Sequence, residues 1–139
     1  MQNDNYLSNK QSSGQNSGRI RILVVDQSLL MLEKLVSILQ RDGRAVVVGT
    51  ATDGWQVLPE VLKLAPDLIL LDLHLPHSDG AEVTRYLKLL PNAPRVFIIT
   101  ADDTAVARRR SMISGADAFL TKSVDIETQL KSNLDQWFG

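Results

Sequence analysis

The chain has 139 residues, 44% of them hydrophobic, which is enough for one domain with a buried core. Its formal net charge of -1 gives no electrostatic reason to expect a nucleic-acid or membrane-surface partner. The absence of cysteine excludes disulfides and thiol chemistry, and no apolar run is long enough to span a bilayer. These observations predict a single cytoplasmic domain.

The first 18 residues are mainly Asn, Gln, Ser and Gly, with few apolar side chains. Such a segment cannot bury enough apolar surface to offset the entropy lost on ordering. We therefore expect a disordered tail over residues 1–18 and a folded domain over residues 19–139.

The rest of the sequence alternates short apolar runs with longer amphipathic segments. The runs have the length and aliphatic content of buried parallel strands and lie at residues 20–25, 45–52, 68–72, 95–100 and 117–121. The amphipathic segments predict helices at residues 29–39, 53–65, 81–90, 104–114 and 126–137. Pro59 should kink the second helix, because proline removes a helical hydrogen bond. Right-handed crossovers between these elements give an α/β fold, a parallel sheet between two helical layers.

Four of the strands end on, or just before, a polar residue: Asp26, Asp72, Thr100 and Lys122. Parallel strands share their carboxyl side, so these residues should meet at one edge of the sheet. Two neighbouring carboxylates suit a divalent cation, while a hydroxyl and an ammonium suit phosphoryl oxygens. Taken alone, Asp72 would be read as a strand-end cap. Taken together, the four residues predict Mg²⁺-assisted phosphoryl transfer to a carboxylate.

Several short motifs occur in order at fixed spacing, at residues 22–26, 53–54, 70–76, 79–80, 99–101 and 115–122. With these motifs the chain resembles the receiver domain of two-component response regulators. The resemblance implies a flavodoxin-like fold, a (βα)5 three-layer sandwich with strand order 2-1-3-4-5. Residues 47–54 are most similar to receivers of LuxR-type regulators.

The resemblance also implies roles for individual residues. Asp72 would accept a phosphoryl group from a sensor histidine kinase or a phosphotransfer protein, and Thr100 and Lys122 would bind its oxygens. Mg²⁺ would be held by Asp26, Asp72 and the main-chain carbonyl of His74.

The switching surface is implied in the same way. Phe119 and Thr100 occupy the positions of the residues that move on activation. A downstream partner would bind the face formed by the helix at 104–114, the strand at 117–121 and the last helix.

The helix at 104–114 carries three consecutive arginines, Arg108, Arg109 and Arg110. They form either a solvated face or part of the partner surface. Trp137 and Phe138 should face the core, unless one of them is exposed and anchors a homodimer.

His74 and Asp102 stand where the resemblance places residues that border the phosphate and tune its hydrolysis. Two histidines in one loop, such as His74 and His77, also occur in transition-metal sites, but such a pair more often faces solvent.

The chain departs from the family pattern at two positions. Gln27 replaces the second acidic residue after the first strand, so a metal site there has less negative charge, and its Mg²⁺ affinity should fall. The Gln27 carbonyl remains a possible neutral ligand. Ser123 follows Lys122 where many receivers have proline, and a cis bond before serine would cost roughly 2.5–4 kcal/mol.

The sequence therefore predicts a receiver that assists its own phosphorylation and dephosphorylation, not an enzyme acting on a separate metabolite. Two alternatives stay open: a pseudo-receiver that binds proteins without efficient phosphorylation, favoured by Gln27, and the receiver half of a LuxR-type DNA-binding regulator. A phosphatase with an aspartate nucleophile would need a second Asp at the position of His74. A dinucleotide-binding domain would need a Gly-rich turn after Asp26.

Overall fold

The computed structural model describes residues 18–139, so the tail expected at residues 1–18 lies, apart from Gly18, outside the described residues. The described strands form one parallel sheet of order β2-β1-β3-β4-β5, which confirms the expected topology. Its strands are β1 (Ile20–Val25), β2 (Ala45–Ala51), β3 (Leu68–Asp72), β4 (Arg95–Thr100) and β5 (Ala118–Thr121).

The helices alternate with the strands as the amphipathic segments predict. They are α2 (Leu29–Gln40), α3 (Gly54–Leu64), α4 (Gly80–Leu87), α5 (Ala105–Ile113) and α6 (Ile126–Phe138). Helix α3 continues through Pro59. Helix α4 ends three residues before its expected boundary, because Leu90 precedes Pro91 and the residue before a proline disfavours helical geometry.

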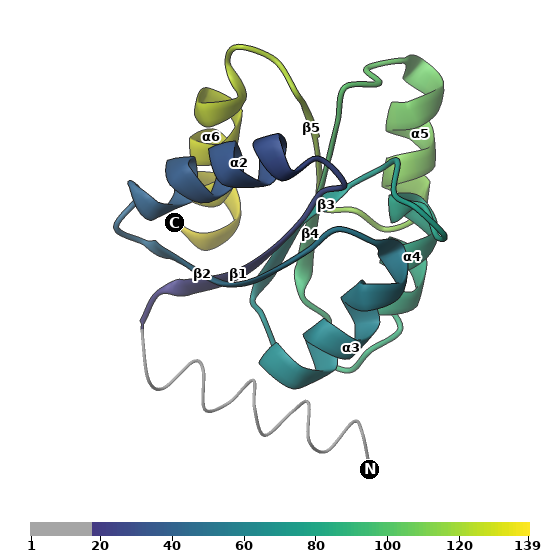
Figure 1. Cartoon of the computed structure of the whole chain (residues 1–139), viewed down its shortest axis with the longest axis horizontal. Helices are drawn as coiled ribbons and strands as arrows, with labels where there is room; N and C mark the ends of the chain where they lie inside the picture. The colour runs from purple at the N-terminus through teal and green to yellow at the C-terminus, as the bar shows by residue number, and fades with distance from the viewer. Residues whose placement is uncertain (1–17) are drawn as a thin grey trace.

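The sheet is covered on both faces (Figure 1). Helices α2 and α6 lie on one face, and α3, α4 and α5 lie on the other. Two separate clusters of buried apolar side chains reflect this arrangement: one joins the sheet to Leu35 of α2 and Leu130 of α6, and the other joins it to Val61 of α3 and Leu87 of α4. The fold is therefore the three-layer sandwich that the sequence predicts.

Strand β3 is the centre of the sheet, and all of its residues from Leu68 to Asp72 are buried. Because both of its faces are packed against helices, a continuous apolar run is required in place of alternation. Truncation of such a side chain, for example Leu70→Ala, would cost about 2–5 kcal/mol. This packing fixes the point at which β3 delivers Asp72 to the carboxyl edge of the sheet.

Two glycines hold the loops at this edge close to the sheet. A Cβ atom on Gly80 would lie 2.4 Å from the carbonyl oxygen of Asp72, and one on Gly54 would lie 2.2 Å from the carbonyl oxygen of Ser78. The amide of Gly80 also donates a 2.7 Å hydrogen bond to the carbonyl of Leu73. Only glycine permits such close backbone contact, which explains the glycine in the pairs Asp53-Gly54 and Asp79-Gly80.

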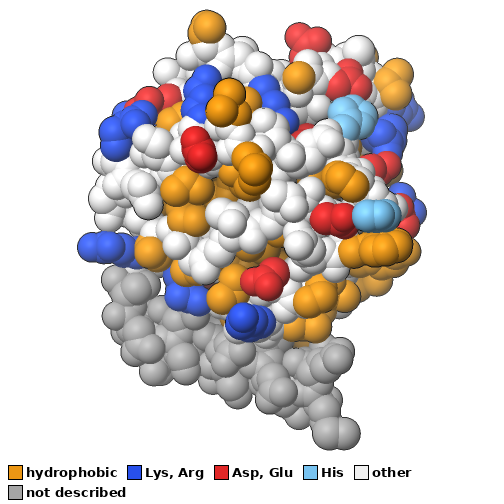
Figure 2. All heavy atoms as spheres, in the orientation of Figure 1, with side chains coloured by type: hydrophobic (Ala, Val, Ile, Leu, Met, Phe, Trp, Pro, Cys, Tyr) orange, Lys and Arg blue, Asp and Glu red, His pale blue; other side chains and the backbone are white. Residues whose placement is uncertain are grey.

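Acidic and basic side chains are interspersed over the face shown in Figure 2, and apolar side chains gather there over α3 and α4. None of the helices in residues 18–139 is both long and apolar enough to cross a membrane.

Candidate functional site

The carboxyl edge of the sheet brings three of the predicted residues into contact. The ammonium nitrogen of Lys122 lies 2.7 Å from Asp26 Oδ2 and 3.3 Å from Asp72 Oδ2. Asp26 is fully buried and Asp72 is 2% exposed. Strands β1 and β3 are adjacent, so they deliver the two carboxylates side by side, while Lys122 reaches them from the end of β5.

The electrostatics of this pocket favour binding of a group that supplies positive charge or hydrogen bonds. Burial raises the pKa of Asp72, the nearby charge of Asp26 raises it further, and Lys122 opposes both effects. The Oδ2 atoms of Asp26 and Asp72 are buried and have no hydrogen-bond donor of good geometry. A buried carboxylate oxygen in this state carries a desolvation cost that a cation or a donor would relieve.

The fourth predicted residue, Thr100, is buried at the end of β4, next to β3. Its hydroxyl oxygen accepts a 3.0 Å hydrogen bond from the amide of Asp102, while its main-chain carbonyl accepts one of 2.9 Å from the amide of Lys122. Thr100 therefore joins the ends of β4 and β5 at the pocket.

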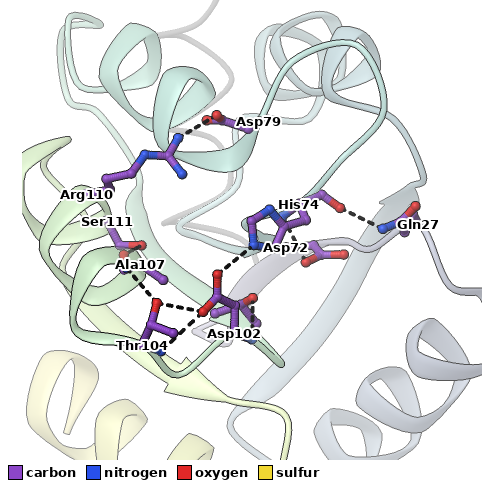
Figure 3. Close-up of polar contacts among 10 residues, drawn as sticks. Gln27, Asp72, His74, Asp79, Asp102, Thr104, Ala107, Arg110 and Ser111 are labelled. Atoms are coloured by element: carbon purple, nitrogen blue, oxygen red, sulfur yellow. Dashed lines mark hydrogen bonds and ion pairs between the residues drawn. The ribbon is translucent and has the colours of Figure 1, made fainter.

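A polar network runs from this pocket to the start of α5 (Figure 3). His74 Nε2 lies 3.2 Å from Asp102 Oδ2, and the hydroxyl of Thr104 donates a 2.7 Å hydrogen bond to Asp102 Oδ1. Thr104 is in turn the N-cap of α5, since its hydroxyl oxygen accepts from the amide of Ala107. The network thus links the loop after β3 to the helix that follows β4.

Gln27 lies beside His74, in a role that its sequence position did not suggest. Its Nε2 atom donates a 2.8 Å hydrogen bond to the main-chain carbonyl oxygen of His74 (Figure 3). In this geometry the amide nitrogen, not the amide oxygen, faces the carbonyl. Asp26 is held separately, because its Oδ1 accepts from the amide of Ser28.

The donor set fits Mg²⁺ in type, though it has less charge than three carboxylates would supply. Two buried carboxylate oxygens, paired only with the Lys122 ammonium, and a main-chain carbonyl are the hard oxygen ligands that Mg²⁺ prefers. Residues 18–139 contain no group of three or more His, Cys, Asp or Glu side chains suited to a metal ion.

The two histidines bind different carboxylates. His74 contacts Asp102, whereas His77 Nδ1 lies 2.5 Å from Asp53 Oδ2 and its ring stacks on Trp55 with centroids 4.1 Å apart. Both are half-exposed. Their surroundings give no support to a transition-metal site.

The expected switch residue Phe119 is partly buried against the core below α3–α5. The guanidinium of Arg108 lies 4.7 Å from the centre of its ring, while that of Arg110 donates a 2.6 Å hydrogen bond to Asp79. Two of the three consecutive arginines therefore make contacts within the chain. Trp137 and Phe138 pack against the core on the α6 side, as expected.

One cluster near the pocket has no motif in the sequence. The side-chain amide of Gln129 on α6 binds both the amide and the carbonyl of Thr121, directly before Lys122. Eight residues separate the partners, across a turn, and a single glutamine on a helix gives no signal of this contact. The contact becomes visible only in the structure, where α6 lies beside the end of β5.

Known proteins match most of this chain. The family model of the response regulator receiver domain matches residues 22–134. A protein-glutamate methylesterase/protein-glutamine glutaminase from Koribacter versatilis is 38% identical over 105 residues, which cover 74% of this chain and 29% of that protein. One from Symbiobacterium thermophilum is 37% identical over 106 residues, with coverage of 74% and 29%. The chain thus spans less than a third of the length of these curated relatives.

Solved structures with the same fold include receivers from two kinds of regulator. The signal receiver domain of NarL from Mycobacterium tuberculosis is 32% identical with a TM-score of 0.80, covering 86% of this chain and 97% of that one. The response regulator domain of Thermotoga maritima CheB is 27% identical with a TM-score of 0.76, covering 85% and 95%. A LuxR-family response regulator from Aurantimonas is 26% identical with a TM-score of 0.79, covering 85% and 84%. The chain belongs to the response regulator receiver domain family.

Proposed function

We propose that the chain is a cytoplasmic phosphoacceptor of a two-component system, phosphorylated on Asp72 by a sensor histidine kinase or a phosphotransfer protein. The observation that carries this proposal is the pair of buried carboxylates of Asp26 and Asp72 with the Lys122 ammonium between them. A purely structural carboxylate at a strand end would have its oxygens hydrogen-bonded, whereas Asp72 Oδ2 has no donor of good geometry.

In the proposed reaction an oxygen of Asp72 attacks the phosphorus of a phosphohistidine. The new P–O bond forms as the P–N bond breaks, and the departing imidazole nitrogen takes the electron pair of that bond. Lys122 and the hydroxyl of Thr100 then bind the phosphoryl oxygens, which carry charge that an ammonium and a hydroxyl donor stabilise. For this the hydroxyl proton of Thr100 must turn toward the new group, while its oxygen keeps the hydrogen bond from Asp102.

Asp26, Asp72 and the carbonyl of His74 would hold Mg²⁺. When bound there, the ion would neutralise charge on the phosphoryl oxygens. The Gln27 amide would share the His74 carbonyl oxygen, which has two lone pairs, with an ion bound there. We therefore propose that the Mg²⁺ affinity of this receiver is lower than that of a site with three carboxylates.

The output is proposed to be a change in the surface formed by α5, β5 and α6. The phosphoryl group adds negative charge and acceptor oxygens, which recruit Thr100 and Lys122 at the ends of β4 and β5. Phe119 lies on β5, two residues before Thr121, and is the side chain through which that change reaches the surface. A downstream protein, or a second copy of the chain, would read it.

A pseudo-receiver is the second candidate, and one observation favours it. The Gln27 amide already satisfies the carbonyl that would face the metal, so the pocket is partly stabilised without an ion. In that case Asp72 would stay unphosphorylated and the α5–β5–α6 face would bind its partner constitutively.

The receiver half of a LuxR-type regulator is the third candidate, suggested by the LuxR-family receivers among the similar structures. In such a regulator the phosphorylated surface would control a DNA-binding domain encoded in the same reading frame. Sequencing of the gene beyond codon 139 tests this candidate: a reading frame that continues into a DNA-binding domain would support it over a receiver that acts alone.

The first test is intact mass after incubation with acetyl phosphate, with and without Mg²⁺. A Mg²⁺-dependent gain of one phosphoryl group that Asp72→Asn abolishes is the expected result. No gain even at high Mg²⁺ would contradict phosphorylation by small donors and favour the pseudo-receiver. Asp103→Asn, an exposed carboxylate in the neighbouring loop, is the matched control and should be phosphorylated like the wild type.

A further inference from the structure

The loop after β5 carries Lys122, and it lies at the free edge of the described sheet. Strand β5 pairs with β4 on one side only, and Thr121 lies opposite Thr100. In a parallel strand the amide and carbonyl of one residue point to the same side, so those of Thr121 point away from β4. Without a partner, these groups would leave the strand end free to fray next to the pocket.

The side chain of Gln129 takes the place of a neighbouring strand. Its Oε1 accepts a 3.0 Å hydrogen bond from the amide of Thr121, and its Nε2 donates one of 3.1 Å to the carbonyl of Thr121. One primary amide thus pairs with both main-chain groups of one residue, as a peptide group of a sixth strand would.

The peptide bond between Thr121 and Lys122 is consequently held from both sides. Its oxygen accepts from Gln129 on α6, while its nitrogen donates a 2.9 Å hydrogen bond to the carbonyl of Thr100 on β4. A peptide plane fixed at both ends fixes the direction in which the Lys122 side chain leaves the backbone. That side chain reaches Asp26 and Asp72 and is only 14% exposed.

The residues of the following turn reinforce this contact. The hydroxyl of Ser123 donates a 2.5 Å hydrogen bond to Asp125 Oδ1, which also accepts a 2.9 Å hydrogen bond from Gln129 Nε2. These two hydrogen bonds, that of Ser123 first, lower the pKa of Asp125. Asp125 is the N-cap residue of α6, yet its side chain makes no capping hydrogen bond. An Asp in that position usually accepts a hydrogen bond from a main-chain amide of its helix, so here the carboxylate binds the turn in place of the helix.

Ser123 completes the turn through its backbone, because its amide donates a 2.9 Å hydrogen bond to the carbonyl of Thr121. Proline has no amide hydrogen and could not make this contact. The described residues contain no cis peptide bond, so the turn is built from trans bonds and side-chain contacts.

From these contacts we propose that Gln129 is a positioning residue for phosphoryl transfer, acting through the backbone of Thr121 to aim Lys122 into the pocket. This inference rests on the proposed function, since it assigns a role in the same reaction. Gln129 itself touches no reacting atom. Its contribution is to hold the ammonium where the phosphoryl oxygens arrive, and misplacement of a catalytic group by about 1 Å can lower a rate by up to ~10²-fold.

The test compares Gln129→Leu, which keeps the size of the side chain but removes its hydrogen bonds, with Gln136→Leu. Gln136 is exposed on the same helix, so the second variant carries the same substitution without the contact. At saturating acetyl phosphate and Mg²⁺, Gln129→Leu should lower the phosphorylation rate constant on the order of tenfold, and Gln136→Leu should leave it unchanged. A wild-type rate in Gln129→Leu would overturn the inference and leave the proposed function standing.

A double-mutant cycle separates positioning from general loss of structure. In a Lys122→Ala background, Gln129→Leu should change the remaining rate by less than about twofold, because the group that it aims is gone. An equal loss in both backgrounds would show that Gln129 acts independently of Lys122 and would overturn the inference. A wild-type chain that gains no phosphoryl group would overturn the proposed function and this inference with it.

Amide hydrogen exchange provides a readout that needs no phosphorylation. The Lys122 amide, which donates to Thr100, should exchange faster in Gln129→Leu than in Gln136→Leu. The Thr121–Lys122 peptide bond loses its hydrogen bond to Gln129 on α6 only in the first variant. Equal exchange in the two variants would mean that β4 alone fixes this peptide bond, and the inference would fail.

Discussion

The side-chain amide of Gln27 donates a 2.8 Å hydrogen bond to the main-chain carbonyl oxygen of His74. The nitrogen must face that oxygen, because two carbonyl oxygens at this separation would repel one another without a cation between them. For Gln27 to serve as a neutral Mg²⁺ ligand, its amide must turn by about half a rotation, which exchanges its nitrogen for its oxygen. Gln27 and the ion thus compete for one carbonyl.

This competition predicts that Gln27→Glu raises the affinity for Mg²⁺ on the order of tenfold, because it removes the competing donor and adds an ionised ligand. Isothermal titration with Mg²⁺ near pH 7 measures the change without any phosphodonor. Gln136→Glu adds the same charge on an exposed part of α6 and should bind Mg²⁺ like the wild type. If Gln27→Glu binds no more tightly than this control, the amide does not limit metal binding.

Asp72→Asn should stabilise the fold at neutral pH. Burial raises the pKa of Asp72 above its ordinary value of 3.8, so the folded chain holds the proton more tightly than the unfolded chain. The stability contributed by this carboxyl is therefore complete below its unfolded pKa and is lost as the pH rises through the raised folded pKa. At pH 7 the ionised Asp72 opposes folding, and asparagine, which does not ionise, removes that cost.

The expected gain is about 1 kcal/mol at pH 7, the lower end of the penalty for a buried unsatisfied polar group. Urea unfolding at pH 7 and at pH 4 measures it, and the difference from wild type should shrink at the lower pH. Asp103→Asn is the control at an exposed position and should change neither value by more than about 0.5 kcal/mol. A destabilised Asp72→Asn at pH 7 would mean that the ion pair with Lys122 outweighs desolvation.

Much of this pocket follows from sequence because its parts lie at strand ends. An apolar run of strand length indicates where β3 ends, and the first polar residue at the end of such a run must appear at the carboxyl edge of the sheet. The strand pattern therefore predicts that Asp26, Asp72 and Lys122 lie together. The strand pattern does not predict contacts that side chains on other elements, such as helices, make with the strand ends.

Gln27 and Gln129 show the limit. Both act through a neutral amide whose two ends are a donor and an acceptor, so composition and spacing do not indicate which end is used or on which partner. From the sequence Gln27 is a possible ligand through its oxygen, whereas in the structure its nitrogen donates to a carbonyl. The partner of Gln129 is the backbone of Thr121. Because nearly every residue has the same main-chain groups, the sequence does not indicate this contact.

Arg108→Gln should loosen the ring of Phe119. The guanidinium lies 4.7 Å from the ring centre, and a contact of this kind at an exposed site is worth about 0.5–1 kcal/mol. The variant should lose about that much unfolding free energy, and the ring signals of Phe119 in an NMR spectrum should shift and broaden. Arg109→Gln is the neighbouring control, and equal effects of the two substitutions would mean that Arg108 does not hold the ring.

The pair formed by His74 and Asp102 should govern how long the phosphorylated state lasts. It joins the loop after β3 to the loop after β4, across the ends of the strands that carry Asp72 and Thr100. An imidazole held there would narrow the path of a water molecule to a phosphoryl group on Asp72. Asp102→Ala should release the ring and shorten the lifetime of the phosphorylated chain by about threefold to tenfold, as expected when an attacking water gains access.

The lifetime is measured from the decay of the phosphorylated mass after the donor is removed. Asp103→Ala, one residue further along the same loop, should leave the lifetime unchanged. Asp102→Ala also frees the hydroxyl of Thr104, whose oxygen caps α5. His74→Ala therefore serves as the second variant, because it removes the imidazole and leaves the cap intact. If both variants keep the wild-type lifetime, access of water is set elsewhere, and the pair serves only to hold the two loops together.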